Sequence, residues 1–163
     1  MRKGWNIGSG KRESVRACRT SRRITDSGEV ESMAKLDRQK LDELKKQLTP
    51  EQYDICFRGG TEVPYSGKYT DNKVQGIYSC AVCANPLFSS ETKYHSGTGW
   101  PSFWAPIEGS LEAHADKSFG MVRTEVRCAT CGAHLGHVFD DGPEPTGQRY
   151  CINSLALIFE KRK

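Results

Sequence analysis

Two Cys-x-x-Cys pairs are the most specific chemical signal in this chain of 163 residues. The first pair is Cys80 and Cys83, and the second is Cys128 and Cys131. Four thiolates fill the tetrahedral shell of a structural zinc ion and leave no open position for a substrate. The alternative is four buried or redox-active thiols without a metal. The 44 residues between the pairs exceed the usual zinc-ribbon spacing. We therefore expect one zinc ion to clip two distant hairpins together, away from the site of any reaction.

Cys151 stands outside both pairs and is the candidate nucleophile. On a strand, Arg149, Cys151 and Asn153 would project to the same face. A guanidinium beside a thiol lowers the thiol pKa and raises the fraction of nucleophilic thiolate. Asn153 could donate a hydrogen bond to a developing anion. The alternative is an inert core cysteine in a core strand.

His134 and His137 follow the second cysteine pair and lie three residues apart. Since four thiolates already complete the metal shell, the histidines are either structural or acid–base groups with pKa values near neutrality. A cysteine, two histidines and Asn153 together favour the catalytic interpretation. Trp100 lies in a Gly/Ser/Trp-rich loop and is either a core residue or the wall of a pocket for an apolar group. Its position in a long loop favours the pocket.

The elements that must position these residues are mostly β-strands. Residues 76–80 are predicted to form a short strand that leads into the first cysteine pair. Residues 121–128 alternate between apolar and charged side chains, which predicts a strand with one face buried. Residues 149–159 give the strongest strand prediction. Because they are apolar on both faces beyond Ser154, we expect this strand to be central.

Two helices are predicted before the strands, and we expect them to lie on the outside of the fold. Four leucines form one helical stripe. They are Leu36, Leu41, Leu44 and Leu48. The second helix should begin with Thr49 as N-cap, Pro50 in the first turn and Gln52 three residues after the cap. It should end at Gly59-Gly60.

The chain length fits one domain, and the mean hydropathy of −0.64 indicates a soluble protein. No run of apolar residues approaches the length needed to span a bilayer, which excludes a transmembrane segment. Residues 1–32 hold 8 of the 24 basic residues and 4 of the 20 acidic ones, which leaves 16 of each in residues 33–163. The folded part is thus neutral, which argues against nucleic acid as a partner. We expect a disordered extension at 1–32 and a cytoplasmic domain at 33–163. The alternative is a mitochondrial or plastid presequence.

Together these motifs resemble the B-type peptide-methionine sulfoxide reductases. The segments that carry the resemblance are the two cysteine pairs, Gly99-Trp100-Pro101-Ser102-Phe103, His134-Leu-Gly-His137-Val-Phe139 and Arg149-Tyr-Cys151-Ile-Asn153-Ser154. The resemblance implies a mainly β fold of two antiparallel sheets (a β-tent), a bound zinc ion and reduction of the R-epimer of methionine sulfoxide in proteins. It also implies that Cys151 is the nucleophile, that Trp100 packs on the substrate S-methyl group, and that His134, His137 and Asn153 surround the sulfoxide oxygen. Phe139 and Arg149 are expected to help bind the substrate.

In that reaction, Cys151 attacks the sulfoxide sulfur and becomes a sulfenic acid, which a second thiol then reduces. Many members of the family carry this resolving cysteine in the loop before Gly-Trp-Pro, but this chain has Thr98 there. Cys56 and Cys18 are the remaining internal candidates, although Cys56 also fits a buried helix residue. Otherwise thioredoxin, glutaredoxin or a small thiol reduces Cys151 directly.

Two other classes of function compete with this interpretation. A zinc-stabilised binding module would use the same scaffold without catalysis, but Cys151 and its neighbours are intact. A cysteine hydrolase would need an oxyanion hole, and no motif marks one. We therefore expect a monomeric enzyme whose partners are oxidised proteins and a thiol reductant such as thioredoxin, with neither nucleic acid nor a membrane.

Overall fold

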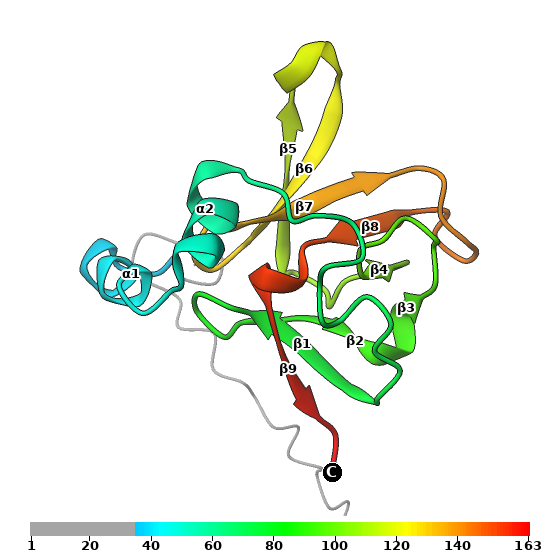
Figure 1. Ribbon diagram of the computed structural model, residues 1–163, viewed down its shortest axis with the longest axis horizontal. Coiled ribbons are helices and arrows are strands. Elements are labelled where there is room, and N and C mark those ends of the chain that lie inside the picture. The colour runs from blue at the N-terminus through cyan, green and yellow to red at the C-terminus, as the bar shows by residue number, and fades with distance from the viewer. Residues whose placement is uncertain (1–34) are drawn as a thin grey trace, which may run out of the picture. The chain divides into compact units, whose positions relative to one another are not determined.

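The computed structural model describes residues 35–163, and the predictions for residues 1–32, Cys18 included, lie outside this range. The described part is mainly β, with two antiparallel sheets and two helices at its side (Figure 1). The helices are α1 (Arg38–Lys45) and α2 (Pro50–Arg58), with short 3-10 turns η1 (Ser90–Thr92), η2 (Ser118–Gly120) and η3 (Ser154–Ala156). The strands are β1 (Gly76–Cys80), β2 (Pro86–Ser89), β3 (Lys93–Tyr94), β4 (Ser102–Phe103), β5 (Leu111–Asp116), β6 (Arg123–Cys128), β7 (His134–Phe139), β8 (Arg149–Ile152) and β9 (Leu157–Lys161).

The sequence signals for the second helix are confirmed residue by residue. The Thr49 side chain accepts a hydrogen bond from the Gln52 backbone N–H, and the Gln52 side chain accepts one from the Thr49 N–H. Pro50 begins α2, and Gly59 ends it with a left-handed φ of 71°. The helix packs against β7 and η3 on the outside of the fold. Three of the four predicted leucines, Leu41, Leu44 and Leu48, pack partly buried against the core.

The two sheets enclose one aromatic core. The smaller sheet has the order β2-β1-β9, and the larger has the order β3-β4-β8-β7-β6-β5. Phe88 of β2 stacks on Phe103 of β4 with ring centroids 4.2 Å apart, and Tyr78 of β1 meets Phe103 edge-on at 5.2 Å. All three rings are fully buried, and each contributes about 2–3 kcal/mol through removal of apolar surface from water. These ring contacts cover one face of the larger sheet, and the opposite face of that sheet is left free.

The prediction of one strand over residues 149–159 is wrong. The chain forms β8, turns through η3 and continues as β9 in the other sheet. The turn is stabilised by the buried carboxylate of Glu62, which accepts hydrogen bonds from the backbone N–H groups of Ser154 and Leu155 at 2.6 and 3.2 Å. Residues 149–159 are apolar on both faces because their two halves pack into the core from different sheets. β8 is central in its sheet, whereas β9 is an edge strand.

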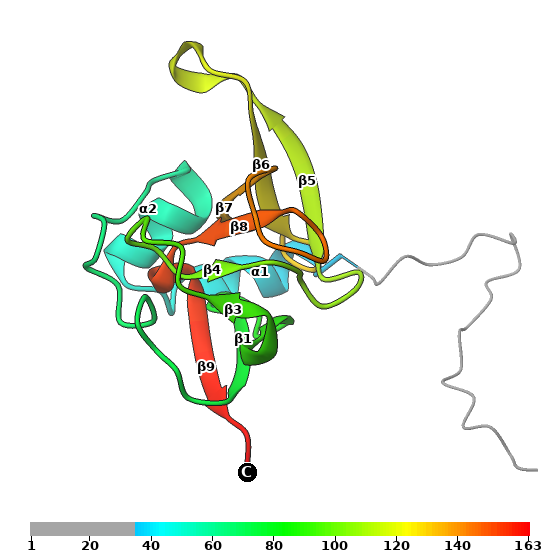
Figure 2. The same ribbon diagram turned by 90° about the vertical axis from the view of Figure 1, so that its right-hand side faces the viewer.

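The hairpin of β5 and β6 projects beyond the rest of the sheet (Figures 1 and 2). The strand predicted from residue 121 begins instead at Arg123, since Met121 and Val122 belong to the exposed hairpin turn. From residue 35 onward, no helix has the length and apolar character needed to cross a lipid bilayer.

Candidate metal centre and active site

The two cysteine pairs form equivalent turns, one in each sheet. In the first turn the backbone N–H of Ala84 donates to the backbone carbonyl of Cys80 at 2.8 Å. In the second turn the backbone N–H of Gly132 donates to the backbone carbonyl of Cys128, also at 2.8 Å. Ala84 and Gly132 occupy the same left-handed position, with φ of 61° and 75°. The first turn joins β1 to β2 and the second joins β6 to β7. The predicted clip between two distant hairpins is therefore confirmed as an arrangement of the chain.

The four sulfurs have the spacing of a metal shell. All lie within 4.8 Å of one another, and the pairs Cys80–Cys131 and Cys83–Cys128 are each 3.6 Å apart. A tetrahedron of sulfurs at about 2.3 Å from a zinc ion has edges of roughly 3.8 Å. A disulfide would need about 2.05 Å. The donor set thus fits zinc, and the cluster offers four protein ligands.

Cys151 lies at the middle of a row of polar side chains that crosses the larger sheet. Its cross-strand neighbours are His137 on β7 and Ser102 on β4. Beyond His137, the row continues to Glu125 on β6 and His114 on β5. Gly136 makes this close pairing feasible, because a Cβ at this position would lie 2.0 Å from the carbonyl oxygen of Cys151.

A hollow of about 110 Å³ opens above Cys151. It is lined by Thr61, Trp100, Arg123, Gly136, His137, Phe139, Cys151 and Asn153. Trp100 is held there because its indole N–H donates to the backbone carbonyl of Glu62 at 3.1 Å. The hollow is thus lined by two aromatic side chains together with a thiol, an imidazole and an amide. None of the four clustered cysteines lines it.

The electrostatic surroundings of Cys151 differ from the expectation. Burial raises the pKa of its thiol, and although Arg149 and a hydrogen bond with Thr98 lower the pKa, burial outweighs them. Arg149 is engaged elsewhere: its guanidinium binds Asp141 through two hydrogen bonds of 2.9 and 3.1 Å and covers the Phe139 ring at 4.4 Å. It does not line the hollow. The Asp141 carboxylate also raises the pKa of Cys151.

Asn153 lies just beyond the end of β8, rather than within the strand, yet it still lines the hollow with Cys151. Its side-chain N–H₂ donates to the carbonyl of Leu135 at 3.0 Å, and its side-chain oxygen accepts from the Glu62 N–H at 3.1 Å. These contacts fix the amide and leave one of its two N–H hydrogens for a ligand.

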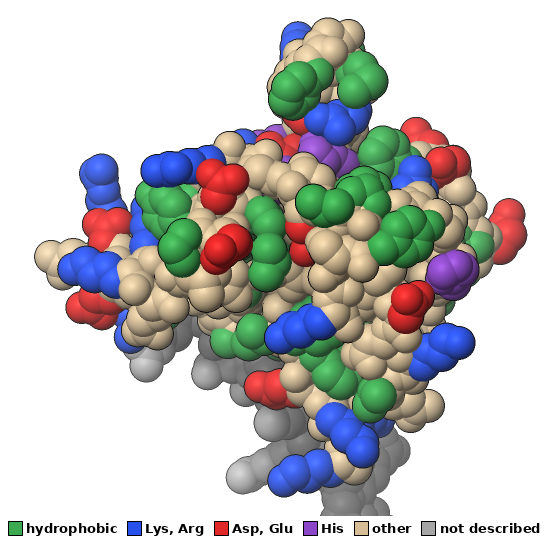
Figure 3. All heavy atoms as spheres, viewed as in Figure 1, with side chains coloured by type: hydrophobic (Ala, Val, Ile, Leu, Met, Phe, Trp, Pro, Cys, Tyr) green, Lys and Arg blue, Asp and Glu red, His purple; other side chains and the backbone are tan. Residues whose placement is uncertain are grey.

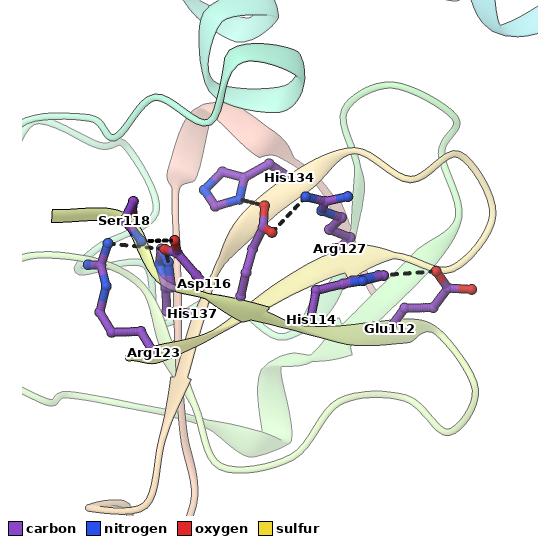
Figure 4. Close-up of polar contacts among 9 residues, drawn as sticks. Glu112, His114, Asp116, Ser118, Arg123, Arg127, His134 and His137 are labelled. Atoms are coloured by element: carbon purple, nitrogen blue, oxygen red, sulfur yellow. Dashed lines mark hydrogen bonds and ion pairs between the residues drawn. The ribbon is translucent and has the colours of Figure 1, made fainter. Parts of the chain in front are cut away.

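His137 is positioned by the projecting hairpin (Figure 4). Its Nε2 lies 2.8 Å from Oδ2 of Asp116 at the end of β5. Arg123, at the start of β6, binds the same carboxylate at 3.2 Å. Hydrogen bonds from Ser118 and then from His137 lower the pKa of Asp116, so the carboxylate is ionised at neutral pH.

His134 lies on the same side of the sheet as His137, with ring centroids 5.5 Å apart. Residues three apart on a regular strand face opposite sides, but a register shift opposite Val126 and Arg127 inserts an extra residue in β7. His134 is 6% exposed, and its Nδ1 lies 2.5 Å from Oε1 of Glu125. Burial lowers the pKa of His134, against the opposing effect of Glu125.

The other nitrogen of His134, Nε2, is buried and has no hydrogen-bond partner among the described residues. His134 does not line the hollow above Cys151 and instead borders a second one with Cys56 and Glu125. Its unpaired nitrogen could accept or hold a proton there.

The internal candidate for recycling of Cys151 within residues 35–163 lies apart from it. Cys56 is 2% exposed in the core, where burial raises its pKa to about 12, and it does not line the hollow. Thr98 lies within hydrogen-bonding reach of the Cys151 thiol. Its hydroxyl is 2.8 Å from that of Ser96, which is 2.6 Å from that of Ser102. A chain of three hydroxyls therefore adjoins the Cys151 thiol on this side.

The carboxylates and other groups that support the site were not predicted from the sequence. Asp116 and Glu125 bind the two histidines, Glu62 supports Trp100 and the turn after β8, and Arg123 and Thr61 line the hollow. Alternation along residues 123–127 did indicate that Glu125 faces away from the core. Glu62 lies in a segment without periodicity, so no local signal identified it.

The fold and the site define a two-sheet β protein with a cluster of four cysteines that could hold a metal ion and a separate cysteine in a partly aromatic hollow. A family profile described as the SelR domain matches residues 48–161. A protein named peptide methionine sulfoxide reductase MsrB from Pseudomonas savastanoi is 58% identical over 124 residues, which cover 76% of this chain and 95% of the relative. A protein of the same name from Pseudomonas syringae is 60% identical over 118 residues, which cover 72% of this chain and 90% of the relative. Another from Thioalkalivibrio sulfidiphilus is 58% identical over 118 residues, which cover 72% of this chain and 86% of the relative. The chain belongs to the SelR domain family, which confirms the resemblance given by its motifs.

Proposed function

We propose that the protein is an oxidoreductase that reduces the R-epimer of methionine sulfoxide in oxidised proteins, with Cys151 as the nucleophile. The observation that carries this proposal is the composition of the hollow above Cys151. Trp100 and Phe139 offer aromatic faces to an S-methyl group, while His137 and Asn153 offer polar groups to a sulfoxide oxygen. The relatives are named peptide methionine sulfoxide reductase, which supports the reduction of methionine sulfoxide.

The chemistry proceeds by attack of the Cys151 thiolate on the sulfoxide sulfur. A bond forms between the Cys151 sulfur and the sulfoxide sulfur while the sulfoxide oxygen takes up protons and leaves as water. Water then attacks the Cys151 sulfur, the sulfur–sulfur bond breaks, and methionine leaves with its electron pair, so that Cys151 is oxidised to a sulfenic acid as the methionine sulfur is reduced. His137 is the proton donor best placed for this step, because it lies directly across the strands from Cys151. Asp116 orients His137, because its Oδ2 lies 2.8 Å from the His137 Nε2. Asn153 donates its remaining N–H to the developing negative charge on oxygen.

The selection of one epimer follows from fixing three substituents around the sulfur. The methyl group would contact the aromatic side chains, the oxygen would contact His137 and Asn153, and the rest of the methionine side chain would point to the opening. With Cys151 attacking from a fixed direction, only one configuration at sulfur meets all three requirements. The assignment to the R-epimer rests on the family.

Zinc is the metal that we propose for the four-cysteine cluster. Cys80, Cys83, Cys128 and Cys131 would hold it as thiolates and join the two sheets. A zinc ion with four protein ligands has no position for a substrate, so its contribution would be to folding.

The sulfenic acid on Cys151 would be reduced by an external thiol, either thioredoxin or a small dithiol. The burial of Cys56 and the presence of Thr98 near Cys151 support this route. We propose that the protein is a monomer. We also propose that it acts in a reducing compartment such as the cytoplasm, which would supply the reductant.

Turnover of each epimer of N-acetyl-methionine sulfoxide, with dithiothreitol and then with thioredoxin, tests the proposed function. We expect reduction of the R-epimer with both reductants and at least about 100-fold less reduction of the S-epimer. Comparable rates for the two epimers would contradict the stereochemical argument. Absence of turnover of both would leave a zinc-stabilised binding module as the better interpretation.

A further inference from the structure

Within residues 35–163, the large exposed apolar side chains are concentrated in a few segments rather than scattered over the surface. The large hydrophobic residues that the described part exposes are Val63, Tyr65, Val74, Phe119, Met121 and Val122. All except Val74 lie in two segments that adjoin the hollow above Cys151. One segment follows Thr61 and the other precedes Arg123, and both of these residues line the hollow. Single exposed apolar residues are ordinary, but such a concentration beside one site indicates an interaction surface.

The second segment, residues 117–122, forms the hairpin tip between β5 and β6. Phe119 is 89% exposed and Val122 is 82% exposed, and hydrophobic side chains lie at the end of the projection (Figure 3). Phe119 also has a φ of 56°, in the left-handed region that glycine or asparagine occupies at lower cost. The turn therefore keeps a large aromatic side chain in water at a position where a small residue would form the turn more easily. Such a cost is commonly retained where the side chain has a function.

The stem of the same hairpin reaches the reacting groups. Asp116 and Arg123 form an ion pair at its base, Asp116 binds His137, and Arg123 lines the hollow. Consecutive Cα atoms are about 3.8 Å apart, so Phe119 lies within about 15 Å of Arg123 along the chain. An extended substrate advances about 3.3 Å per residue. The hairpin tip can thus contact residues up to about four positions from the methionine that occupies the hollow.

We propose that the hairpin tip, through Phe119, Met121 and Val122, binds apolar side chains that flank the methionine sulfoxide in the substrate polypeptide. This inference rests on the proposed function. The chemistry of the substrate favours this occupant, because methionine is mostly a core residue, and the core-facing residues of strands and helices recur two to four positions along the chain. Oxidation makes the side chain polar and disrupts the core, which exposes those neighbours together with the sulfoxide. A polypeptide damaged in this way presents the apolar surface that the tip would cover.

The test compares three substrates under dithiothreitol: N-acetyl-methionine (R)-sulfoxide, a peptide with leucines two to four residues from the sulfoxide, and the same peptide with serines there. We expect the wild-type protein to have a kcat/KM about tenfold higher for the leucine peptide than for the serine peptide. The double variant Phe119→Asn, Val122→Ser should lose this preference and retain its kcat/KM for N-acetyl-methionine sulfoxide. Asparagine suits the left-handed position, so the turn should be retained. Val74→Ser, an exposed valine elsewhere, is the matched control, and Phe119→Leu should keep most of the preference.

Several results would overturn the inference. One is a double variant that keeps the preference, and another is one that loses activity equally on all three substrates. A wild-type dimer that the double variant converts to a monomer would assign the tip to a second copy of the chain. A defect seen only when thioredoxin replaces dithiothreitol would assign it to the reductant. Failure of the proposed function is distinguishable, because wild-type protein would then not turn over even N-acetyl-methionine sulfoxide.

Discussion

Cys128 and Cys151 lie in the same sheet, yet their surroundings give them opposite chemistry. The Cys128 sulfur is fully buried, 3.6 Å from that of Cys83, and receives a hydrogen bond from the Asn85 side chain at 3.7 Å. Cys151 is partly exposed, in a hollow beside an imidazole and an indole. The Cys128 sulfur lies beside the other clustered sulfurs and is inaccessible to a substrate. The Cys151 sulfur is accessible and has no second sulfur beside it. The groups that surround a cysteine, rather than the residue type, therefore decide whether it supports the fold or reacts.

The largest expected effect comes from breaking the metal shell. Cys128→Ser removes one of the four thiolates, and a structural zinc site contributes about 10 kcal/mol or more to folding. Since a whole domain is stable by only about 5–15 kcal/mol, the variant should fail to fold stably. Zinc content by elemental analysis and thermal unfolding measure the effect, with Cys151→Ser as the matched control. Zinc-free protein that folds and reduces substrate would contradict the structural assignment.

Cys151→Ser should give the complementary result. We expect a loss of activity of at least about 1,000-fold, because a serine hydroxyl is a much weaker nucleophile than a thiolate. Its unfolding free energy should stay within about 1 kcal/mol of wild type, since the substitution is small and the site partly exposed. Substantial turnover by the serine variant, measured with the R-epimer and dithiothreitol, would show that another group reacts.

The pH dependence of the reaction should respond to the charges around Cys151. Burial raises the pKa of this thiol, so kcat/KM should rise with pH as the thiolate forms. Arg149→Met removes a charge that lowers this pKa, so the rising limb should move to higher pH. Asp141→Asn removes a charge that raises the same pKa, and the limb should move to lower pH. One pKa unit corresponds to about tenfold in thiolate fraction below the pKa.

Full pH profiles of the two variants check these opposite shifts. A shift of both rising limbs in the same direction would mean that the limb reports a group other than Cys151. A matched surface variant, Glu91→Gln, removes a negative charge from an exposed position in η1 and should leave the profile unchanged.

The smallest effect is expected at Cys56. Cys56→Ser should leave thioredoxin-dependent kcat/KM within about twofold of wild type if an external thiol reduces Cys151. Free thiols counted after one turnover without reductant should then fall by one rather than two. A Cys56–Cys151 disulfide found by peptide mapping would instead show that α2 moves to deliver an internal thiol, since disulfide geometry needs Cα atoms within about 7 Å.

Local signals in the sequence predicted much of this structure. The cysteine pairs, the capping box at Thr49 and the strand at residues 76–80 each depend on residues close together in the chain, and all three appear as predicted. The division of residues 149–159 between two sheets could not be predicted in this way. It depends on Glu62, a carboxylate 92 positions from Ser154, whose role exists only once the chain has folded. Asp116 was missed for the same reason, because its pairing with His137 requires the bend of the hairpin.

The proposed mechanism requires that Cys151 alone changes oxidation state while the clustered cysteines remain bound to metal. Its most direct test is one turnover of N-acetyl-methionine (R)-sulfoxide without reductant, followed by trapping with a sulfenic-acid reagent and peptide mass spectrometry. We predict one adduct per chain, on Cys151, with the zinc content unchanged. Full formation of methionine without an adduct on Cys151, or with oxidation of Cys80, Cys83, Cys128 or Cys131 and release of zinc, would contradict the account.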